Sequence, residues 1–373
     1  MAEDIFDAIV VGGGIAGSTA AYLLAKKGLG VLLVERGNTN GNKNMTGGRL
    51  YTHGLEKLFP DFAEKAPLER KIVRERYTYE KGREQKTIEL DETSLCVQGN
   101  SYTVLRSGFD QWLGECAENE GAMCVTGVRV DELMIRDGKI CGIIAGGEEM
   151  EANVVILADG VNSLLGQRAG MREELLPEAA EVGAKEVIEL GETVIEERFG
   201  LKQGEGMQWI FEGKSAFGQE GTGFLYTNHD SISLGILTQI DTIRADGTAV
   251  TEMVDRFKEN PEIKELLQGG KLVEYSAHLL PKGGSLSKLY RDGLLVIGDA
   301  AGLVVNKGYV VRGMDLAVES ARIAAETVVK ASEAGDFGEE MLKNYETGLR
   351  ESFLWEEMKR QESYNEELAE IFA

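Results

Sequence analysis

The N-terminal part of the chain alternates between apolar runs and a segment with helical periodicity. Residues Ile5 to Val11 form an apolar run, the residues up to Lys27 place apolar side chains at helical spacing, and a second apolar run spans Val31 to Val34. Short apolar runs bounded by glycine are typical of buried strands, and the spacing between them is typical of a helix. The pattern therefore predicts a strand–helix–strand unit at the start of the chain.

Glycines mark the first turn of this unit. Gly12, Gly14 and Gly17 have G-x-G-x-x-G spacing, and Glu35 ends the second strand. Such glycines permit a tight turn, the approach of a pyrophosphate to the backbone and close helix–strand packing, while the terminal acid binds ribose hydroxyls. A glycine-rich turn alone would be ordinary. The complete arrangement favours dinucleotide binding.

The rest of the chain divides into strands and helices by the same criteria. Alternating segments predict antiparallel strands at 73–79, 87–90 and 101–105, and a β-meander at 124–130, 139–145 and 151–157. Helical patterns occupy 53–65, the segment after Arg106, 164–178, 249–257, 261–267 and 313–331, and two amphipathic helices are expected within 338–373. Residues 179–284 otherwise alternate, which predicts an inserted antiparallel sheet.

Two further strands end in an acid and small residues. The first runs into ADG at 158–160, which contains Asp159, and the second into GDAAG at 298–302, which contains Asp299. Small residues after an acid allow a ligand to approach the backbone. The helix expected from Gly313 follows the second of these turns, and its N-terminus can stabilise negative charge.

Other segments support two interpretations each. The loop with Gly47 and Gly48 is either a surface connection or a bare backbone that lies flat against a planar ring, and Arg106 is either a surface residue or a partner for a phosphate. Five aromatic residues either pack in a core or line a pocket or a shallow membrane-facing patch. They are Trp209, Phe211, Phe217, Phe224 and Tyr226.

Composition limits the possible partners. The chain has 373 residues, 63 acids and 40 bases, and a net charge of −23, so nucleic acid and anionic lipid are unfavourable partners. Its four cysteines include no C-x-x-C pair and it has three histidines, so we expect no metal site and a reducing compartment. Because Glu3 and Asp4 stand where a signal peptide has basic residues, we expect a cytoplasmic protein.

Together, GGGIAG with Glu35, ADG and GDAAG resemble the FAD-binding pattern of the glutathione-reductase-2 type flavoproteins. These include aromatic hydroxylases, geranylgeranyl reductases and electron-transfer-flavoprotein:quinone oxidoreductases. Residues 44–62, 221–236, 259–284 and 298–320 look like the FixC-type dehydrogenases within that group. The resemblance extends to about residue 345.

The resemblance implies which residues hold FAD. Ala16 and its glycine neighbours would hold the pyrophosphate, and Glu35 with Arg36 the adenosine. The remaining expected contacts are Arg106, the backbone at Val130, Asp159, Asp299 by the ribityl-phosphate region, and Gly313 with Met314 by the isoalloxazine.

The implied fold class is α/β: a Rossmann-like FAD-binding domain with a βαβ start and a three-stranded meander, an inserted antiparallel β-sheet domain, and C-terminal helices. The expected boundaries are 1–72, 101–178 and 285–337 for the FAD-binding domain, 73–100 and 179–284 for the sheet domain on the substrate or quinone side, and 338–373 for the helices.

The implied function is electron transport: an oxidoreductase whose FAD takes electrons from an electron-transfer flavoprotein and passes them to a membrane quinone or a ferredoxin-like protein. The latter would be a separate partner, because the chain has no cysteines for its own iron–sulfur domain. A quinone acceptor leaves peripheral contact with the inner face of the cell membrane open. No side chain is assigned as an acid or base, because the flavin carries the redox chemistry.

Three alternatives stay open: a geranylgeranyl (prenyl) reductase, an aromatic hydroxylase and a flavin-binding scaffold without activity. The hydroxylase is disfavoured by the loop VVNKGYVVRG after GDAAG, where hydroxylases usually place a proline.

Overall fold

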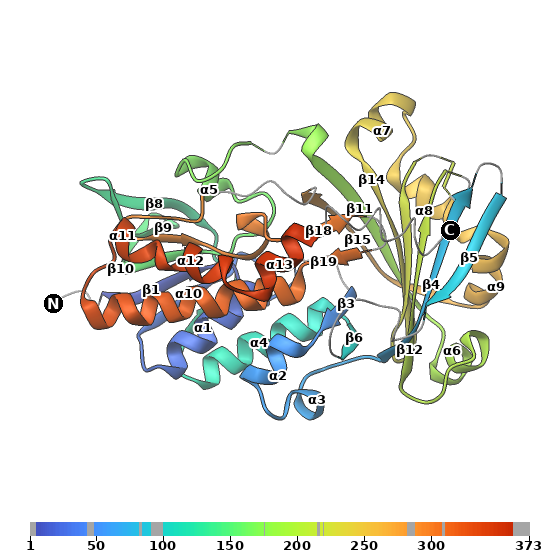
Figure 1. Ribbon diagram of the computed structural model, residues 1–373, viewed down its shortest axis with the longest axis horizontal. Coiled ribbons are helices and arrows are strands. Elements are labelled where there is room, and N and C mark those ends of the chain that lie inside the picture. Colours follow the sequence, from blue (N-terminus) through green and yellow to red (C-terminus); the bar gives the residue numbers. More distant parts are fainter. Residues whose placement is uncertain are drawn as a thin grey trace. The chain divides into compact units, whose positions relative to one another are not determined.

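The computed structural model describes residues 5–42, 48–81, 84–90, 100–174, 176–214, 217–218, 220–281, 288–307 and 310–360 of the chain. The fold divides into two compact units (Figure 1). The first unit contains Met1–Lys43, Ser107–Leu175 and Pro281–Ala373, and the second contains Asn44–Arg106 and Leu176–Leu280.

A mainly parallel sheet forms the centre of the first unit. Its strands follow the order β16 (Tyr290–Arg291), β17 (Leu294–Val296), β10 (Glu148–Leu157), β1 (Phe6–Val11), β2 (Val31–Val34) and β7 (Met123–Val125). The antiparallel strands β8 (Val130–Arg136) and β9 (Lys139–Ala145) extend from β10 as a meander. The strands β2 and β17 are buried along their whole length, as expected where a parallel sheet is covered on both faces.

Helices and one hairpin complete the first unit. The helix α1 (Ile15–Lys26) follows β1 and packs against α10 (Met314–Ala334). The other elements are α4 (Arg106–Asn119), α5 (Leu164–Arg168), the 3-10 turn η2 (Gly298–Ala301), the hairpin β18 (Val305–Lys307) and β19 (Val310–Arg312), α11 (Glu339–Leu342), α12 (Asn344–Arg350) and α13 (Phe353–Arg360).

A nine-stranded sheet forms the second unit. Its order is β15 (Lys271–Pro281), β11 (Ala180–Glu189), β14 (Ser231–Gln239), β13 (Thr222–Thr227), β12 (Glu205–Glu212), β4 (Lys71–Lys81), β6 (Ser101–Val104) and β3 (Gly48–Tyr51), with β5 (Glu84–Leu90) paired to β4. The remaining elements are α2 (His53–Leu58), α3 (Phe62–Lys65), η1 (Pro177–Ala179), α6 (Glu192–Phe199), α7 (Ile240–Asp246), α8 (Val250–Lys258) and α9 (Pro261–Leu267).

The aromatic residues of the second unit form part of its core. The rings of Trp209 and Phe211 stack at 4.7 Å, and Phe257 of α8 meets Phe211 and Phe217 edge-on at 4.9 and 5.1 Å. All five aromatics from the sequence analysis expose at most 6% of their surface. Trp209, Phe211 and Phe217 belong to the buried hydrophobic cluster of this unit, which confirms the core interpretation for these three residues. Because all five side chains are buried, a membrane-facing patch of them is wrong.

The expected strand over residues 124–130 is wrong, because the backbone turns within it. The strand β7 ends at Val125 and pairs with β2 in parallel. Gly127 then has φ +75°, and its amide donates to Gly37 O at 2.7 Å. The meander starts only at Val130. A positive φ at glycine allows this reversal without strain.

Two expected helices are shorter than their patterns. The helix over 53–65 divides into α2 and α3 around Pro60, which cannot continue a helix. The helix over 164–178 stops at Arg168 and is followed by Gly170 with φ +69°. Within the described part of the tail, three short helices replace the two expected ones.

The segments 48–72 and 101–106 lie in the second unit, because β3 and β6 pair with each other and β6 with β4. The division into functional domains that we expect from the sequence places both segments with the cofactor and stays a prediction.

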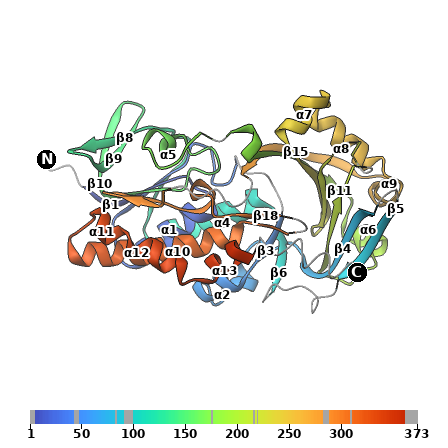
Figure 2. The same cartoon turned by 45° about the horizontal axis from the view of Figure 1, so that its top comes forward.

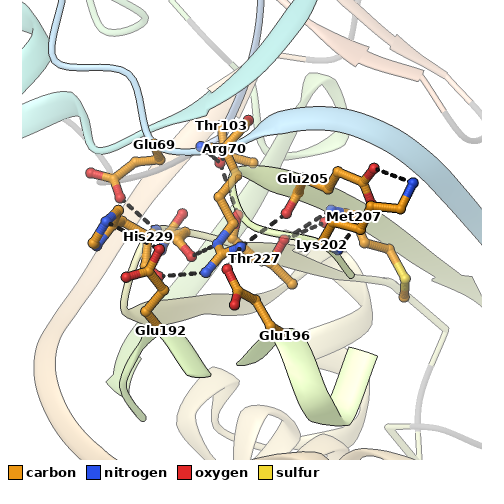
Figure 3. A network of polar contacts seen from close by, with 11 residues as sticks. Glu69, Arg70, Thr103, Glu192, Glu196, Lys202, Glu205, Met207, Thr227 and His229 are labelled. Atoms are coloured by element: carbon orange, nitrogen blue, oxygen red, sulfur yellow. Dashed lines mark hydrogen bonds and ion pairs between the residues drawn. The ribbon is translucent and has the colours of Figure 1, made fainter. Parts of the chain in front are cut away.

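A buried arginine ties several loops of the second unit together (Figure 3). Arg70 exposes 1% of its surface. Its Nε donates to Asn228 O at 2.6 Å, its Nη2 to His229 O at 2.8 Å and its Nη1 to Glu205 O at 3.1 Å. The same Nη1 lies 3.3 Å from Glu196 of α6. One guanidinium therefore satisfies three carbonyls from two separate turns.

The substitution Arg70→Met should lower the free energy of unfolding by about 3 kcal/mol, because it leaves buried carbonyls without a donor. Urea unfolding would measure this loss. The matched control is Arg74→Met on β4, the strand that follows Arg70. Arg74 also donates to a carbonyl, Phe199 O at 2.8 Å, but its side chain is 34% exposed, so water can replace it. Equal losses of unfolding free energy in both variants would contradict the prediction that the buried contacts of Arg70 stabilise the protein more than the exposed contacts of Arg74.

Candidate cofactor-binding site

The first glycine motif touches the second motif directly. Gly12 has φ +107°, and a Cβ there would lie 2.3 Å from Ala158 O and 3.2 Å from the Cα of Asp159. A Cβ at Gly17 would lie 1.9 Å from Gly12 O. Because non-bonded atoms cannot approach so closely, only glycine fits either position. These contacts hold the start of α1 against the end of β10.

The third motif meets the same place. A Cβ at Gly298 would lie 2.9 Å from the Cβ of Ala16, and the Gly298 amide donates to Ser320 Oγ of α10 at 3.1 Å. At the start of α10, a Cβ on Gly313 would lie 3.7 Å from Asp299 Oδ1. Residues 12–17, 158–160 and 298–302 thus share one location, which we call the motif junction.

Glu35 is fixed at the end of β2 by backbone amides. Its Oε2 accepts from Gly13 N at 2.7 Å and its Oε1 from Gly37 N at 2.5 Å, and the residue is 8% exposed. Carboxylate oxygens have further lone pairs, which can accept hydrogen bonds from ribose hydroxyls. Asn40 packs beside Gly13, 2.2 Å from the position of a Cβ there.

Asp159 of the second motif is a buried acid. Burial raises the pKa of its carboxyl to about 6, and its Oδ1 has no hydrogen-bond partner among the residues that the structure describes. Nearby, Arg172 Nη1 donates to Val161 O at 2.7 Å and to Ala300 O at 3.5 Å. Arg172 therefore ties the loop after the second motif to the third motif.

The residues at the motif junction fit a dinucleotide cofactor. Gly14 is the N-cap residue of α1 and provides no side-chain cap. The first N–H groups of α1 can therefore bind phosphate. Two buried side-chain oxygens, Asn40 Oδ1 and Asp159 Oδ1, have no hydrogen-bond partner within the described part of the chain. Bare glycine backbone, free donors and unpaired acceptors match the phosphates and hydroxyls of such a ligand.

The structure places the other expected site residues as follows. Met314 is the first residue of α10, and Arg36 is exposed. Val130 is the first residue of β8. Two residues earlier, the amide of Val128 donates a hydrogen bond to Glu35 O at 3.0 Å. Gly48 and Arg106 belong to the second unit, where Gly48 pairs with Val104. Gly47 lies outside the described residues. The roles of all these residues in cofactor binding stay predictions.

Three residues at or beside the motif junction have no signal in the sequence: Asn40, Arg172 and Ser320. Asn40 stands in a polar loop, Arg172 follows a short helix, and Ser320 lies inside α10. None of them belongs to a spaced motif, so no local signal distinguished them.

No helix in the described ranges is long and apolar enough to cross a membrane. The same ranges contain no group of three or more His, Cys, Asp or Glu side chains that could hold a metal ion.

Residues 7–95 match the family model described as FAD dependent oxidoreductase. Among solved structures, a geranylgeranyl bacteriochlorophyll reductase-like protein from Thermoplasma acidophilum aligns with a TM-score of 0.75 and 23% identity, over 96% of this chain and 88% of that chain. The myxobacterial FAD-dependent halogenase CndH aligns with a TM-score of 0.73 and 20% identity, over 93% and 79%. These likenesses confirm the predicted α/β fold class, and the cofactor is FAD.

The substitution Gly17→Ala should weaken FAD binding at least about tenfold, because the new methyl would push α1 away from the Gly12 carbonyl. Flavin fluorescence during titration of the apo-protein would measure the dissociation constant. The control is Gly108→Ala on α4, where a Cβ would meet nothing within 4 Å. If both variants bind FAD equally, the close approach at Gly17 is not required.

Asp159 should give the apo-protein a distinctive pH dependence. Its pKa is raised from an ordinary 3.8 to about 6, so its contribution to stability is fully present below pH 3.8 and is lost between pH 3.8 and about 6. Asp159→Asn should remove this loss, a gain of roughly 2–3 kcal/mol above pH 7 relative to the wild type. Urea unfolding across that interval, from about pH 3.5 to about pH 7, would measure it. Parallel pH profiles of the two proteins would refute the prediction.

Curated relatives cover nearly the whole chain. The protein FixC of Escherichia coli O157:H7 is 48% identical over 354 residues, which are 94% of this chain and 82% of FixC. The probable electron transfer flavoprotein-quinone oxidoreductase YdiS of E. coli K12 is 48% identical over 364 residues, 96% of this chain and 84% of YdiS. The chain, as its motifs indicate, belongs to the FixC family of FAD-dependent oxidoreductases.

Proposed function

We propose that this oxidoreductase takes electrons from an electron-transfer flavoprotein and passes them to a quinone or a ferredoxin-like protein. The observation that carries the proposal is its 48% identity over 364 residues to YdiS, whose name states both an electron-transfer flavoprotein and a quinone. Bound FAD supplies the redox chemistry, and the protein supplies binding, orientation and electrostatics.

The residues at the motif junction would bind and orient the flavin. The N-terminus of α1 and Gly12 to Gly17 would hold the pyrophosphate, Glu35 the ribose, and Asp299 with Gly313 the part toward the flavin ring. We assign no acid or base for this function, since electron transfer between two bound cofactors requires none on the protein.

A protein donor agrees with the nucleotide-binding signals in the sequence. The G-x-G-x-x-G spacing occurs once, and these glycines are already used at the motif junction. A second such unit, which a stably bound nicotinamide cofactor would commonly use, does not occur. This supports another carrier, such as a protein-bound flavin, as the electron donor, although some hydroxylases use NADPH without such a unit.

A quinone acceptor would bring the protein to the inner face of the cell membrane. The aromatic cluster of the second unit is buried and is unsuited to this contact. The edge strand β15 instead exposes about half of the surface of Leu272, Val273 and Tyr275. Such exposed apolar residues can contact a bilayer or a partner protein.

The reduced electron-transfer flavoprotein of the same organism should bleach the visible flavin absorption of the purified holoprotein at stoichiometric amounts. The measurement is an anaerobic titration followed by visible spectroscopy, with NADPH alone as the comparison. We expect NADPH to react at least about a hundredfold more slowly, because the sequence contains no second G-x-G-x-x-G unit for it.

Rapid bleaching by NADPH alone, or no response to the reduced partner, would contradict the proposal. The first outcome would direct attention to the prenyl reductase or hydroxylase alternatives. A flavin that neither donor reduces would indicate a binding scaffold.

A further inference from the structure

A buried charged cluster stands at the start of α10. Arg312 Nε and Nη2 donate to Asp315 Oδ2 at 2.8 and 2.6 Å, and Arg312 Nη1 lies 2.9 Å from Glu357 Oε2 of α13. The side chains of Arg312 and Asp315 are 2% exposed, and that of Glu357 is 17% exposed. We call these three residues the α10 clasp.

The clasp joins elements that are distant in the sequence. Arg312 ends β19, Asp315 lies in the first turn of α10, and Glu357 belongs to α13. The helix α13 packs beside α10, as Figure 2 shows. The guanidinium of Arg312 also lies 5.9 Å from the ring of Phe353 on α13. The helix α13 is thus anchored to the N-terminus of α10 by charge and by packing.

The clasp borders the motif junction. Gly313 lies between Arg312 and the first residue of α10. A Cβ added to Gly313 would lie 3.7 Å from Asp299 Oδ1. In addition, Asp315 Oδ1 is buried and has no hydrogen-bond partner among the residues that the structure describes. A buried carboxylate oxygen without a donor is costly. The cluster therefore includes a buried carboxylate oxygen that its described contacts do not satisfy.

The charges in the clasp sum to one net negative charge. Two carboxylates, Asp315 and Glu357, face one guanidinium. Charges interact over several ångströms when they are buried, because the dielectric constant inside a protein is lower than that of water. A negative charge near a redox group opposes the addition of electrons, and the positive end of a helix dipole favours it. At the start of α10 these two influences oppose each other.

We propose that Arg312, Asp315 and Glu357 are positioning residues that set the reduction potential of the bound flavin through the N-terminus of α10. The inference rests on the placement of the flavin ring by Gly313 and Met314, which belongs to the proposed function. It requires neither the electron-transfer flavoprotein nor the quinone.

The sign of the change in potential separates electrostatics from loss of structure. Glu357→Gln and Asp315→Asn each remove one negative charge and should make the flavin easier to reduce. Arg312→Gln removes the positive charge and should make it harder to reduce. At a fixed solution potential, we expect the ratio of reduced to oxidised flavin to change roughly threefold to tenfold in these opposite directions.

The experiment is an anaerobic reductive titration of each holoprotein with a chemical reductant and reference dyes. The control is Glu346→Gln on α12, which removes the same charge from an exposed ion pair with Arg350 and should leave the potential unchanged. The dissociation constant of FAD and the melting temperature of the apo-protein are measured for each variant.

A merely structural clasp would give a different result: lower melting temperatures and weaker FAD binding in all three variants, without potentials that move in opposite directions. That outcome, or potentials equal to that of Glu346→Gln, would overturn the inference. Because a chemical reductant is used, the result is independent of whether the proposed protein donor reacts. If Arg312→Gln does not fold, easier reduction of the flavin in both Glu357→Gln and Asp315→Asn, but not in Glu346→Gln, supports the inference, and its absence overturns it.

Discussion

The first unit depends on backbone contacts that no side chain could occupy. Gly12 lies against the Ala158 carbonyl, and Gly17 lies against the Gly12 carbonyl. These approaches allow α1 to begin directly above the ends of β1 and β10, with its uncapped N–H groups at the motif junction. The turn that we expect to bind phosphate is therefore a consequence of packing, since its backbone lies where no Cβ atoms fit.

Burial at the motif junction has an energetic consequence. Asp159 and Asn40 keep oxygens without partners, and burial raises the pKa of Asp159. Unpaired buried acceptors destabilise a protein unless a ligand donates to them. The apo-protein therefore has unsatisfied groups at the place where we expect FAD hydroxyls to bind, so that bound FAD would stabilise the fold.

The second unit achieves order in a different way. Its nine-stranded sheet carries an aromatic core on one side, and Arg70 compensates several backbone carbonyls at the ends of strands. A single fully buried arginine with carbonyl partners from remote turns fixes loop positions that strand pairing alone would leave variable. The family membership from whole-chain similarity assigns FAD chemistry to the protein.

The sequence by itself determined the βαβ start, the three motifs, the cofactor class and most strands, because glycine spacing and hydrophobic periodicity are local properties. It failed where a single glycine or proline interrupted a pattern, as at Gly127 and Pro60. Tertiary structure alone decided that Arg172 joins two motifs, that Arg70 serves three carbonyls, and that Glu357 reaches Arg312. These contacts join residues from distant parts of the chain, and their partners are mostly backbone carbonyls, which every residue has. No residue type or spacing in the sequence can therefore predict these contacts.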